Sequence, residues 1–317
     1  MASVHDMTRA REDALGSADR SLLHDGGVRV GVIDVGSNTV RLLVVDGAHA
    51  VEQRRVILGL GRSIEDTGAI PEEKLAETVE CVAEWVAIAR RYRVERLEVL
   101  VTSPGRQAAN GDELLERLAA TARVPVRLLS APEEGRLAFL GALARTPGGD
   151  DGAIAVCDVG GGSAQITIGT RDGGPAWTRS LDLGSRRLAS RCFGDDPPGD
   201  AAVNAARLEM TRYLDGLAFP APKTALAVGG SARSLKKLSG GTLGSRELAE
   251  AIGRLARTPA DELASAYDLD PGRLSTLAAG AVILAAIQER LGVPLRIGRG
   301  GLREGAALEL GARAAAA

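Results

Sequence analysis

The chain has 317 residues, of which 45% are hydrophobic and 25% are charged. A chain of this length can bury a sizeable core and favours two domains over one, which excludes a small disordered module. Because only 3% of the residues are aromatic and the net charge is −2, nucleic acid and membranes are not expected as partners, and any affinity for phosphate must come from locally placed groups.

Cysteine and histidine usage narrows the chemistry further. Cys81, Cys157 and Cys192 are far apart and form no C-x-x-C pair, so we expect free thiols rather than a disulfide framework or a zinc site. All three histidines lie within the first fifty residues, which leaves acid and base work to carboxylates. Neither a signal peptide nor a run of about eighteen apolar residues is evident, so we expect a cytoplasmic protein. A homodimer is left open.

The first predicted elements follow a polar segment, residues 1–27, which we expect to be a disordered tail. From Val28, two runs rich in β-branched residues, VRVGVID and TVRLLVVD, flank a Gly-Ser-Asn turn and predict a pair of strands. Apolar residues at steps of three and four predict an amphipathic helix over 71–92. Strands at 97–102 and 124–129 and helices at 112–122 and 133–144 follow. This alternation indicates an α/β fold.

A second unit is predicted after the turn-forming residues PGGDDG at 147–152. Strands at 153–158 and 164–169 flank three glycines, and a strand at 226–228 leads into a glycine pair. The remaining expected elements are helices at 200–217, 246–256, 259–266 and 273–291, a strand at 295–297 and a helix at 302–314. We therefore expect one domain over 28–145 and a second over 146–301, with the last helix packing back on the first.

Both predicted domains begin with the same plan. VGVIDVGSNTVRLLVV starts at Val30 and IAVCDVGGGSAQITIG starts at Ile154, and each reads as a strand, an Asp, a glycine-containing turn and a second strand. Small residues in such turns allow successive backbone N–H groups to converge on phosphate oxygens. One Asp-Gly turn is a weak signal, because such turns also simply end strands. Two of them, with glycine pairs at 229–230 and 300–301, predict a cleft that holds a phosphate chain from both sides.

Seven segments make the chain similar to the exopolyphosphatase and guanosine pentaphosphate phosphohydrolase (Ppx/GppA) family. They are DVGSNTVRLL at Asp34, TSPGR at Thr102, LSAPEEGRLAFLGA at Leu129, DVGGGS at Asp158, LDLGSRRL at Leu181, GGSARSL at Gly229 and GGLREG at Gly300. The resemblance implies two actin-like (ribonuclease H-like) domains with a central inter-domain cleft. It also implies hydrolysis of the terminal phosphoanhydride of inorganic polyphosphate, or of guanosine pentaphosphate, with Mg²⁺ or alternatively Mn²⁺.

The general base of the family maps onto the second acid of the E-E-x-R segment, Glu134. Its place in the first turn of a predicted helix suits that role, since a side chain there can reach the domain junction. The alternative is that Glu133 and Glu134 only favour the helix N-terminus as first-turn acids. Asp34 and Asp158 are the candidates to hold Mg²⁺, which needs few carboxylates beside substrate oxygens, although either could instead only orient its turn.

Substrate contacts are predicted from small residues and arginines inside the motifs. Donors to phosphate are expected at Ser37, Asn38, Arg41, Arg106, Gly160, Gly161, Gly162, Ser163, Gly230 and Ser231. The resemblance implies that Gly230 and Ser231 occupy the place where kinases with actin-like domains hold a nucleoside. Here they would hold a later phosphate or a guanosine. Arg303 and Glu304 are left open between site residues and an ordinary ion pair.

One position departs from the family pattern. Relatives place an acid that assists the metal where this chain has Gln165, whose amide carbonyl can coordinate Mg²⁺ but brings no negative charge. As the second residue of its predicted strand, Gln165 faces away from Ala164 and Ile166. Two hypotheses remain: a polyphosphate hydrolase, and a regulatory protein that binds polyphosphate or alarmones with weak or no turnover. A sugar or acetate kinase is a weaker rival, because the chain is short and carries E-E-x-R and L-R-E-G segments.

Overall fold

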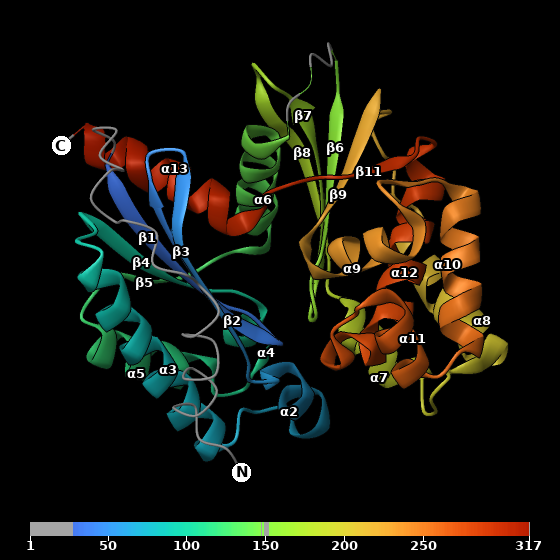
Figure 1. Ribbon diagram of the computed structural model, residues 1–317, viewed down its shortest axis with the longest axis horizontal. Helices are drawn as coiled ribbons and strands as arrows, with labels where there is room; N and C mark the ends of the chain where they lie inside the picture. Colours follow the sequence, from blue (N-terminus) through green and yellow to red (C-terminus); the bar gives the residue numbers. More distant parts are fainter. Residues whose placement is uncertain (1–27, 147, 149–151, 317) are drawn as a thin grey trace.

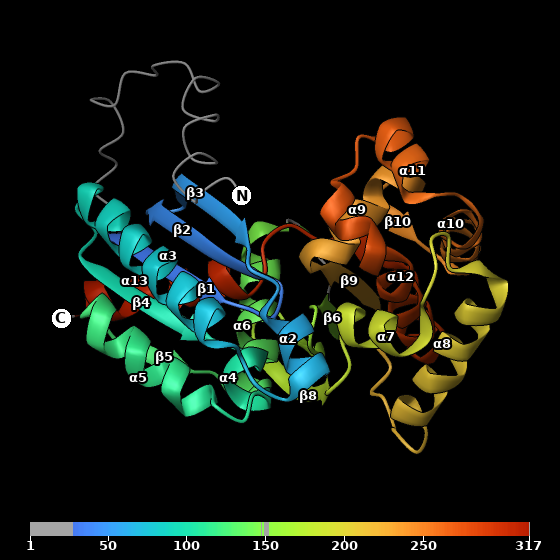
Figure 2. The same ribbon diagram turned by 90° about the horizontal axis from the view of Figure 1, so that it is seen from below.

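The computed structural model describes residues 28–146, 148 and 152–316, which form two mixed sheets surrounded by helices (Figure 1). The tail predicted over 1–27 and most of the turn predicted at 147–152 lie outside these residues. One sheet has five strands and the other has six, and the two lie side by side when the molecule is seen from below (Figure 2). The predicted α/β fold is confirmed.

The first sheet is covered by helices on both faces. Its strand order is β3-β2-β1-β4-β5; β1 to β3 are antiparallel neighbours, whereas β1, β4 and β5 are parallel neighbours. Because side chains alternate along a strand, Ile33 packs under α3 and α5, whereas Val32 packs on the opposite face. These elements are β1 (Arg29–Val35), β2 (Thr39–Asp46), β3 (His49–Ile57), α3 (Glu72–Arg91), β4 (Arg96–Val101), α5 (Gly111–Ala122) and β5 (Val126–Leu128).

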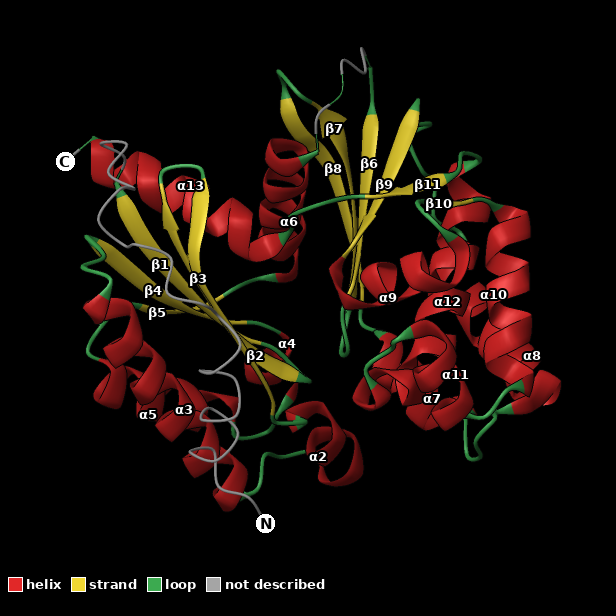
Figure 3. Ribbon diagram, viewed as in Figure 1, coloured by secondary structure: helices red, strands yellow, loops and turns green. Residues whose placement is uncertain are grey.

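The second sheet has the order β10-β11-β9-β6-β7-β8. Its strands are β6 (Ile154–Val159), β7 (Ala164–Thr170), β8 (Gly174–Leu181), β9 (Thr224–Val228), β10 (Thr242–Leu243) and β11 (Leu295–Ile297). A group of helices covers one face and forms the largest core with it (Figure 3): α7 (Ser185–Cys192), α8 (Gly199–Leu214), α9 (Gly229–Ser239), α10 (Ser245–Arg257), α11 (Ala260–Tyr267) and α12 (Pro271–Leu291).

Helix α6 (Ala131–Arg145) lies between the two sheets and beside α13 (Leu302–Ala315) (Figure 1). Leu137 packs into the core that α13 shares with the first sheet, whereas Phe139 packs against strands of the second sheet. The two helices approach closely at glycines: a β-carbon at Gly141 would lie 2.0 Å from the carbonyl oxygen of Gly301. The first turn of α6 is thereby held at the junction of the two halves.

The sequence does not predict several elements, for identifiable reasons. β3 and β8 are the edge strands of their sheets, and their partly exposed sequences HAVEQRRVI and GPAWTRSL lack a clear apolar face. Helices α4 (Ser103–Gln107), α7 and α9 begin inside glycine- or proline-containing motifs that read as turns. α2 (Leu60–Thr67) is a short helix between Gly59 and Gly68, both of which have a left-handed backbone. The short strand β10 is also missed.

Helix α12 is long and apolar enough to cross a membrane, although no such run is predicted from the sequence. In its most apolar stretch the mean hydropathy is 1.3, and 67% of that stretch is buried inside the molecule. Residues such as Ile283 and Leu284 are completely buried against the second sheet and its helices. α12 is therefore the core helix of the second half.

Candidate active site

A cleft between the two sheets is lined by residues from both halves of the chain. All of the predicted site residues except Arg106 line it: Asp34, Ser37, Asn38, Arg41, Glu134, Asp158, Gly160, Gly161, Gly162, Ser163, Gln165, Gly230 and Ser231. They come from β1 and β6 and the turns that follow them, from β2 and β7, and from the starts of α6 and α9. Motifs far apart in the sequence thus meet at one place.

The two Asp-Gly turns face each other directly. A β-carbon at Gly162 would lie 2.4 Å from the Ser37 hydroxyl oxygen and 2.7 Å from that of Ser103, and these two hydroxyls are hydrogen-bonded at 2.6 Å. The N–H groups of Asn38 and Gly161 donate no hydrogen bond within the described part of the chain. Free backbone donors on both sides of a narrow gap are what a phosphate chain requires.

Asp34 and Asp158 end the first strand of each hairpin and face the cleft. Burial raises the pKa of Asp34 to about 6 and also raises that of Asp158, while the charge of Arg41 opposes both shifts. Neither carboxylate accepts a hydrogen bond from any described residue. No described group of three or more acidic, His or Cys side chains could hold a metal ion. Two carboxylates without donors nevertheless fit Mg²⁺, whose remaining ligands are waters and substrate oxygens.

Strand register relates the two hairpins residue by residue. Asp34 lies opposite Arg41, and Asp158 lies opposite Gln165, so each pair shares one face of its sheet. Gln165 is buried, and its amide nitrogen donates to the hydroxyls of Ser163 at 2.9 Å and Ser180 at 3.3 Å. Its carbonyl oxygen has no partner among the described residues. The position beside Asp158 therefore carries a neutral oxygen donor.

Glu134 lies in the first turn of α6 and is 6% exposed. Burial raises its pKa to about 7; Arg106 lowers it, and the charges of Asp34 and Asp158 raise it further. The guanidinium of Arg106 donates to the Glu134 carboxylate and, at 2.6 Å, to the carbonyl of Leu129. The sequence predicts a phosphate contact for Arg106, whereas the structure places it behind Glu134, outside the residues that line the cleft.

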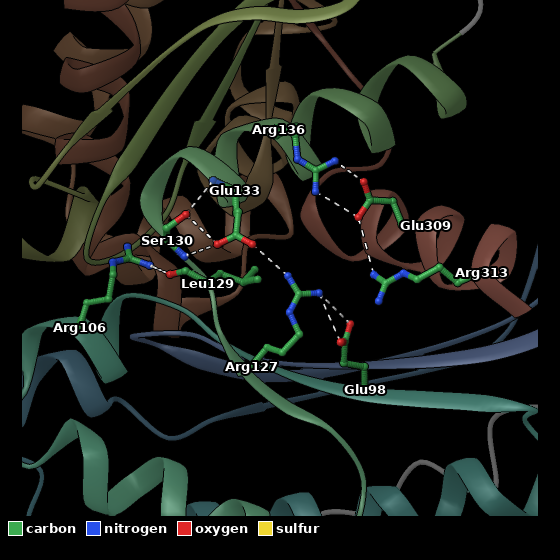
Figure 4. Close-up of polar contacts among 9 residues, drawn as sticks. All are labelled: Glu98, Arg106, Arg127, Leu129, Ser130, Glu133, Arg136, Glu309 and Arg313. Carbon is green, nitrogen blue, oxygen red and sulfur yellow. Dashed lines mark hydrogen bonds and ion pairs between the residues drawn. The ribbon is translucent and has the colours of Figure 1, made fainter.

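Glu133 has a different role from its neighbour (Figure 4). Its carboxylate accepts from the backbone N–H and the hydroxyl of Ser130, at 2.8 and 2.7 Å, and completes a capping box at the start of α6. Arg127 pairs with Glu133 at 3.0 Å and with Glu98 of β4 at 3.3 Å. Glu133 is thus the first-turn acid that caps the helix, and it anchors the turn that presents Glu134.

Three further arginines, which the sequence does not single out, line the cleft: Arg186, Arg233 and Arg273. Together with Arg41, the side chains of Arg233 and Arg273 make no hydrogen bond or ion pair with the described residues, and the Nε of Arg41 is buried without a partner. Burial and neighbouring arginines lower the pKa of Arg41 to about 9. Arg303 lies in the same cleft and donates to the carbonyl of Leu42 at 3.2 Å. Arginine is too frequent in this chain for these positions to stand out in the sequence.

Two α/β halves that present matching Asp-Gly hairpins to a shared polar cleft define an actin-like, two-domain protein. The chain belongs to the Ppx/GppA phosphatase family, whose family model matches residues 42–313.

Relatives extend over almost the whole chain. It is 32% identical to Exopolyphosphatase 1 of Mycobacterium tuberculosis over 88% of this chain and 87% of that protein. Exopolyphosphatase 2 of the same species is 28% identical over 89% of this chain and 98% of that protein. The crystal structure of the Ppx/GppA family member of Aquifex aeolicus superposes with a TM-score of 0.76 at 26% identity, covering 89% of this chain and 97% of that one. The resemblance seen in the sequence is confirmed.

Proposed function

We propose that this protein hydrolyses inorganic polyphosphate from its end and releases orthophosphate. The observation that best supports this is that one cleft contains, among the described residues, both arginines without ion-pair partners and carboxylates without hydrogen-bond donors. The side chains of Arg41, Arg233 and Arg273 form no hydrogen bond or ion pair with the described residues. Asp34 and Asp158 have no hydrogen-bond donor in the same part of the chain. A polyanion satisfies the arginines and a divalent cation satisfies the carboxylates, and a magnesium-bound phosphate chain brings both.

Phosphate binding, metal binding and proton transfer can each be assigned to residues of this chain. The arginines and the N–H donors of the two turns hold the terminal phosphoryl group and stabilise its negative charge. Asp34 and Asp158 would hold Mg²⁺, which supplies further charge neutralisation at the phosphate oxygens. Glu134 accepts a proton from the attacking water, and its raised pKa makes it a stronger base than an ordinary carboxylate. Water attacks the terminal phosphorus, the bond to the bridging oxygen breaks, and orthophosphate leaves the shortened chain.

Polyphosphate suits the cleft better than guanosine pentaphosphate does. Its described lining residues are charged, hydroxyl-bearing or glycine for the most part, and none is aromatic. A guanine base would find no ring to stack on near Gly230 and Ser231. Apolar lining is provided by Val159, Leu277 and Leu302. A row of phosphates, by contrast, can use every arginine in the cleft.

A regulatory protein that binds the same ligands with little turnover is the second candidate. Gln165 favours it, because the residue beside Asp158 is an amide whose nitrogen is already engaged with Ser163 and Ser180. A neutral oxygen attracts Mg²⁺ less strongly than a carboxylate does.

The proposed location is the cytoplasm. Cys81, Cys157 and Cys192 are free, and burial raises the pKa of the Cys81 and Cys157 thiols to about 12. Unpaired, unreactive thiols fit a reducing compartment.

The test compares orthophosphate release from long-chain polyphosphate, tripolyphosphate and guanosine pentaphosphate in Mg²⁺. We expect release from polyphosphate to be fastest. Release from guanosine pentaphosphate alone would overturn the substrate assignment, and tight binding of polyphosphate without any release would support the regulatory candidate.

A further inference from the structure

A row of charged side chains crosses the first sheet from the candidate metal site to the edge strand. Asp34 of β1 lies opposite Arg41 of β2, and Arg41 lies opposite Arg55 of β3. Residues directly opposite each other on antiparallel strands point to the same face. Two inter-strand spacings, about 10 Å, separate Asp34 from Arg55. The row therefore leads from the place of the terminal phosphoryl group outward along the sheet.

At its outer end the row meets an acid from the other half of the molecule. Arg55 forms an ion pair with Asp270, the N-cap residue of α12, and their side chains are 34% and 37% exposed. The two halves are close here, since a β-carbon at Gly272 would lie 3.2 Å from Cδ1 of Ile57. Arg273, which lines the cleft, interacts electrostatically with both Arg55 and Asp270. The Arg55–Asp270 pair thus connects the two halves at the outer end of the row of charged side chains, just outside the cleft.

The Asp270 carboxylate binds Arg55 as a phosphate group of a bound substrate would. This carboxylate forms an ion pair with Arg55 of the first half and interacts electrostatically with Arg273 of its own half. Neither Arg55 nor Asp270 is among the residues that line the cleft. A short substrate bound at Asp34 therefore leaves the pair intact, whereas a longer phosphate chain following the row reaches it.

We propose that Arg55 and Asp270 form a chain-length gate. Asp270 holds Arg55 when no substrate is bound there, and the distal phosphates of a long polyphosphate replace the Asp270 carboxylate on Arg55. This inference rests on the proposed polyphosphate hydrolase function and adds a preference for long chains. Because exposed ion pairs are weak, the exchange is readily reversible and changes affinity by no more than about fivefold.

Two substitutions test the gate in opposite directions. Asp270→Asn removes the competing charge and keeps the cap on α12, because Asn and Asp cap helices about equally well. We expect it to lower KM for long-chain polyphosphate by about three- to fivefold with kcat unchanged. Arg55→Gln should raise that KM by a similar factor and reduce its salt dependence. Neither should alter KM for tripolyphosphate. Asp200→Asn, at the exposed Arg257–Asp200 pair between α8 and α10, is the matched control and should change neither substrate.

The alternatives give different results. Equal changes of KM for tripolyphosphate and long chains would show that the pair only clamps the two halves together, and would overturn the gate. Calorimetric binding of long-chain polyphosphate in Mg²⁺, measured in a Glu134→Gln background so that the chain is not hydrolysed, tests the proposed function and the gate separately. Absence of binding there would overturn the proposed function itself. Binding of equal strength with and without Asp270→Asn or Arg55→Gln in that background would overturn the gate alone.

Discussion

Replacing Glu134 by Gln tests the proposed chemistry of the cleft. The amide keeps the shape of the carboxylate and can still accept from Arg106, but it cannot take a proton from water. General-base positioning of water is worth about 10²- to 10⁴-fold in rate. We therefore expect kcat for orthophosphate release from polyphosphate to fall by about that factor, while the affinity for polyphosphate changes little.

The same substitution should stabilise the folded protein at high pH. Burial raises the pKa of Glu134 on folding from its ordinary value of 4.5 to about 7. The sign follows from linkage: the stability that the protonated carboxyl contributes is fully present below pH 4.5 and is lost as the pH rises through about 7. The difference corresponds to about 3 kcal/mol. Because Gln stays neutral, we expect Glu134→Gln to be more stable than wild type by up to that amount at pH 8.

Urea unfolding in EDTA at pH 5 and pH 8, beside the activity assay, measures both effects. Glu133→Gln is the matched control, because hydrogen bonds from Ser130 lower the pKa of Glu133. Its contribution is present above the unfolded pKa and is lost as the pH falls, so this variant should be less stable at pH 8 by under about 1 kcal/mol and should remain active. A Glu134→Gln protein that hydrolyses polyphosphate at the wild-type rate, or that gains no stability between pH 5 and pH 8, would refute the reasoning.

Four further substitutions test the rest of the site. Gln165→Glu should lower the Mg²⁺ concentration for half-maximal activity, or start hydrolysis in a protein that otherwise only binds; an unchanged metal titration would mean that this side chain does not face the metal. Gly36→Val and Gly161→Val, one in each of the two Asp-Gly turns that line the cleft, should weaken polyphosphate binding comparably; folded variants with wild-type affinity would contradict a cleft that holds the phosphate chain from both sides. Arg273→Gln should raise KM for polyphosphate several-fold without loss of thermal stability, because the guanidinium forms no hydrogen bond or ion pair with the described residues; a wild-type KM would show that it does not touch substrate.

The two hairpins and their turns could be predicted because local rules determine them. β-branched runs on either side of Asp34 and Asp158 indicate strands, and small residues between the strands permit tight turns. The same segments carry the family resemblance, so the cleft and most of its lining follow from sequence alone. The proposal that Glu134 rather than Glu133 acts as base needed the resemblance, since both are first-turn acids. In the structure only Glu134 faces the cleft.

What the sequence does not predict depends on long-range geometry. Arg55 and Asp270 are 215 residues apart, and neither lies in a motif. Arg273 reaches the cleft because α12 begins beside the start of α9, which no local pattern reveals. The placement of Arg106 behind Glu134 likewise depends on how α4 meets the first turn of α6.

The central claim is that the cleft hydrolyses phosphate chains with Glu134 as the base. The most direct measurement is orthophosphate release from long-chain polyphosphate by the wild-type protein, in saturating Mg²⁺, from pH 5 to pH 9. The account predicts release whose rate falls as the pH drops below about 7, where Glu134 becomes protonated, and near-complete loss of that release in Glu134→Gln. Tight binding of polyphosphate with no release at any pH, or a rate that is unchanged by Glu134→Gln, would contradict it.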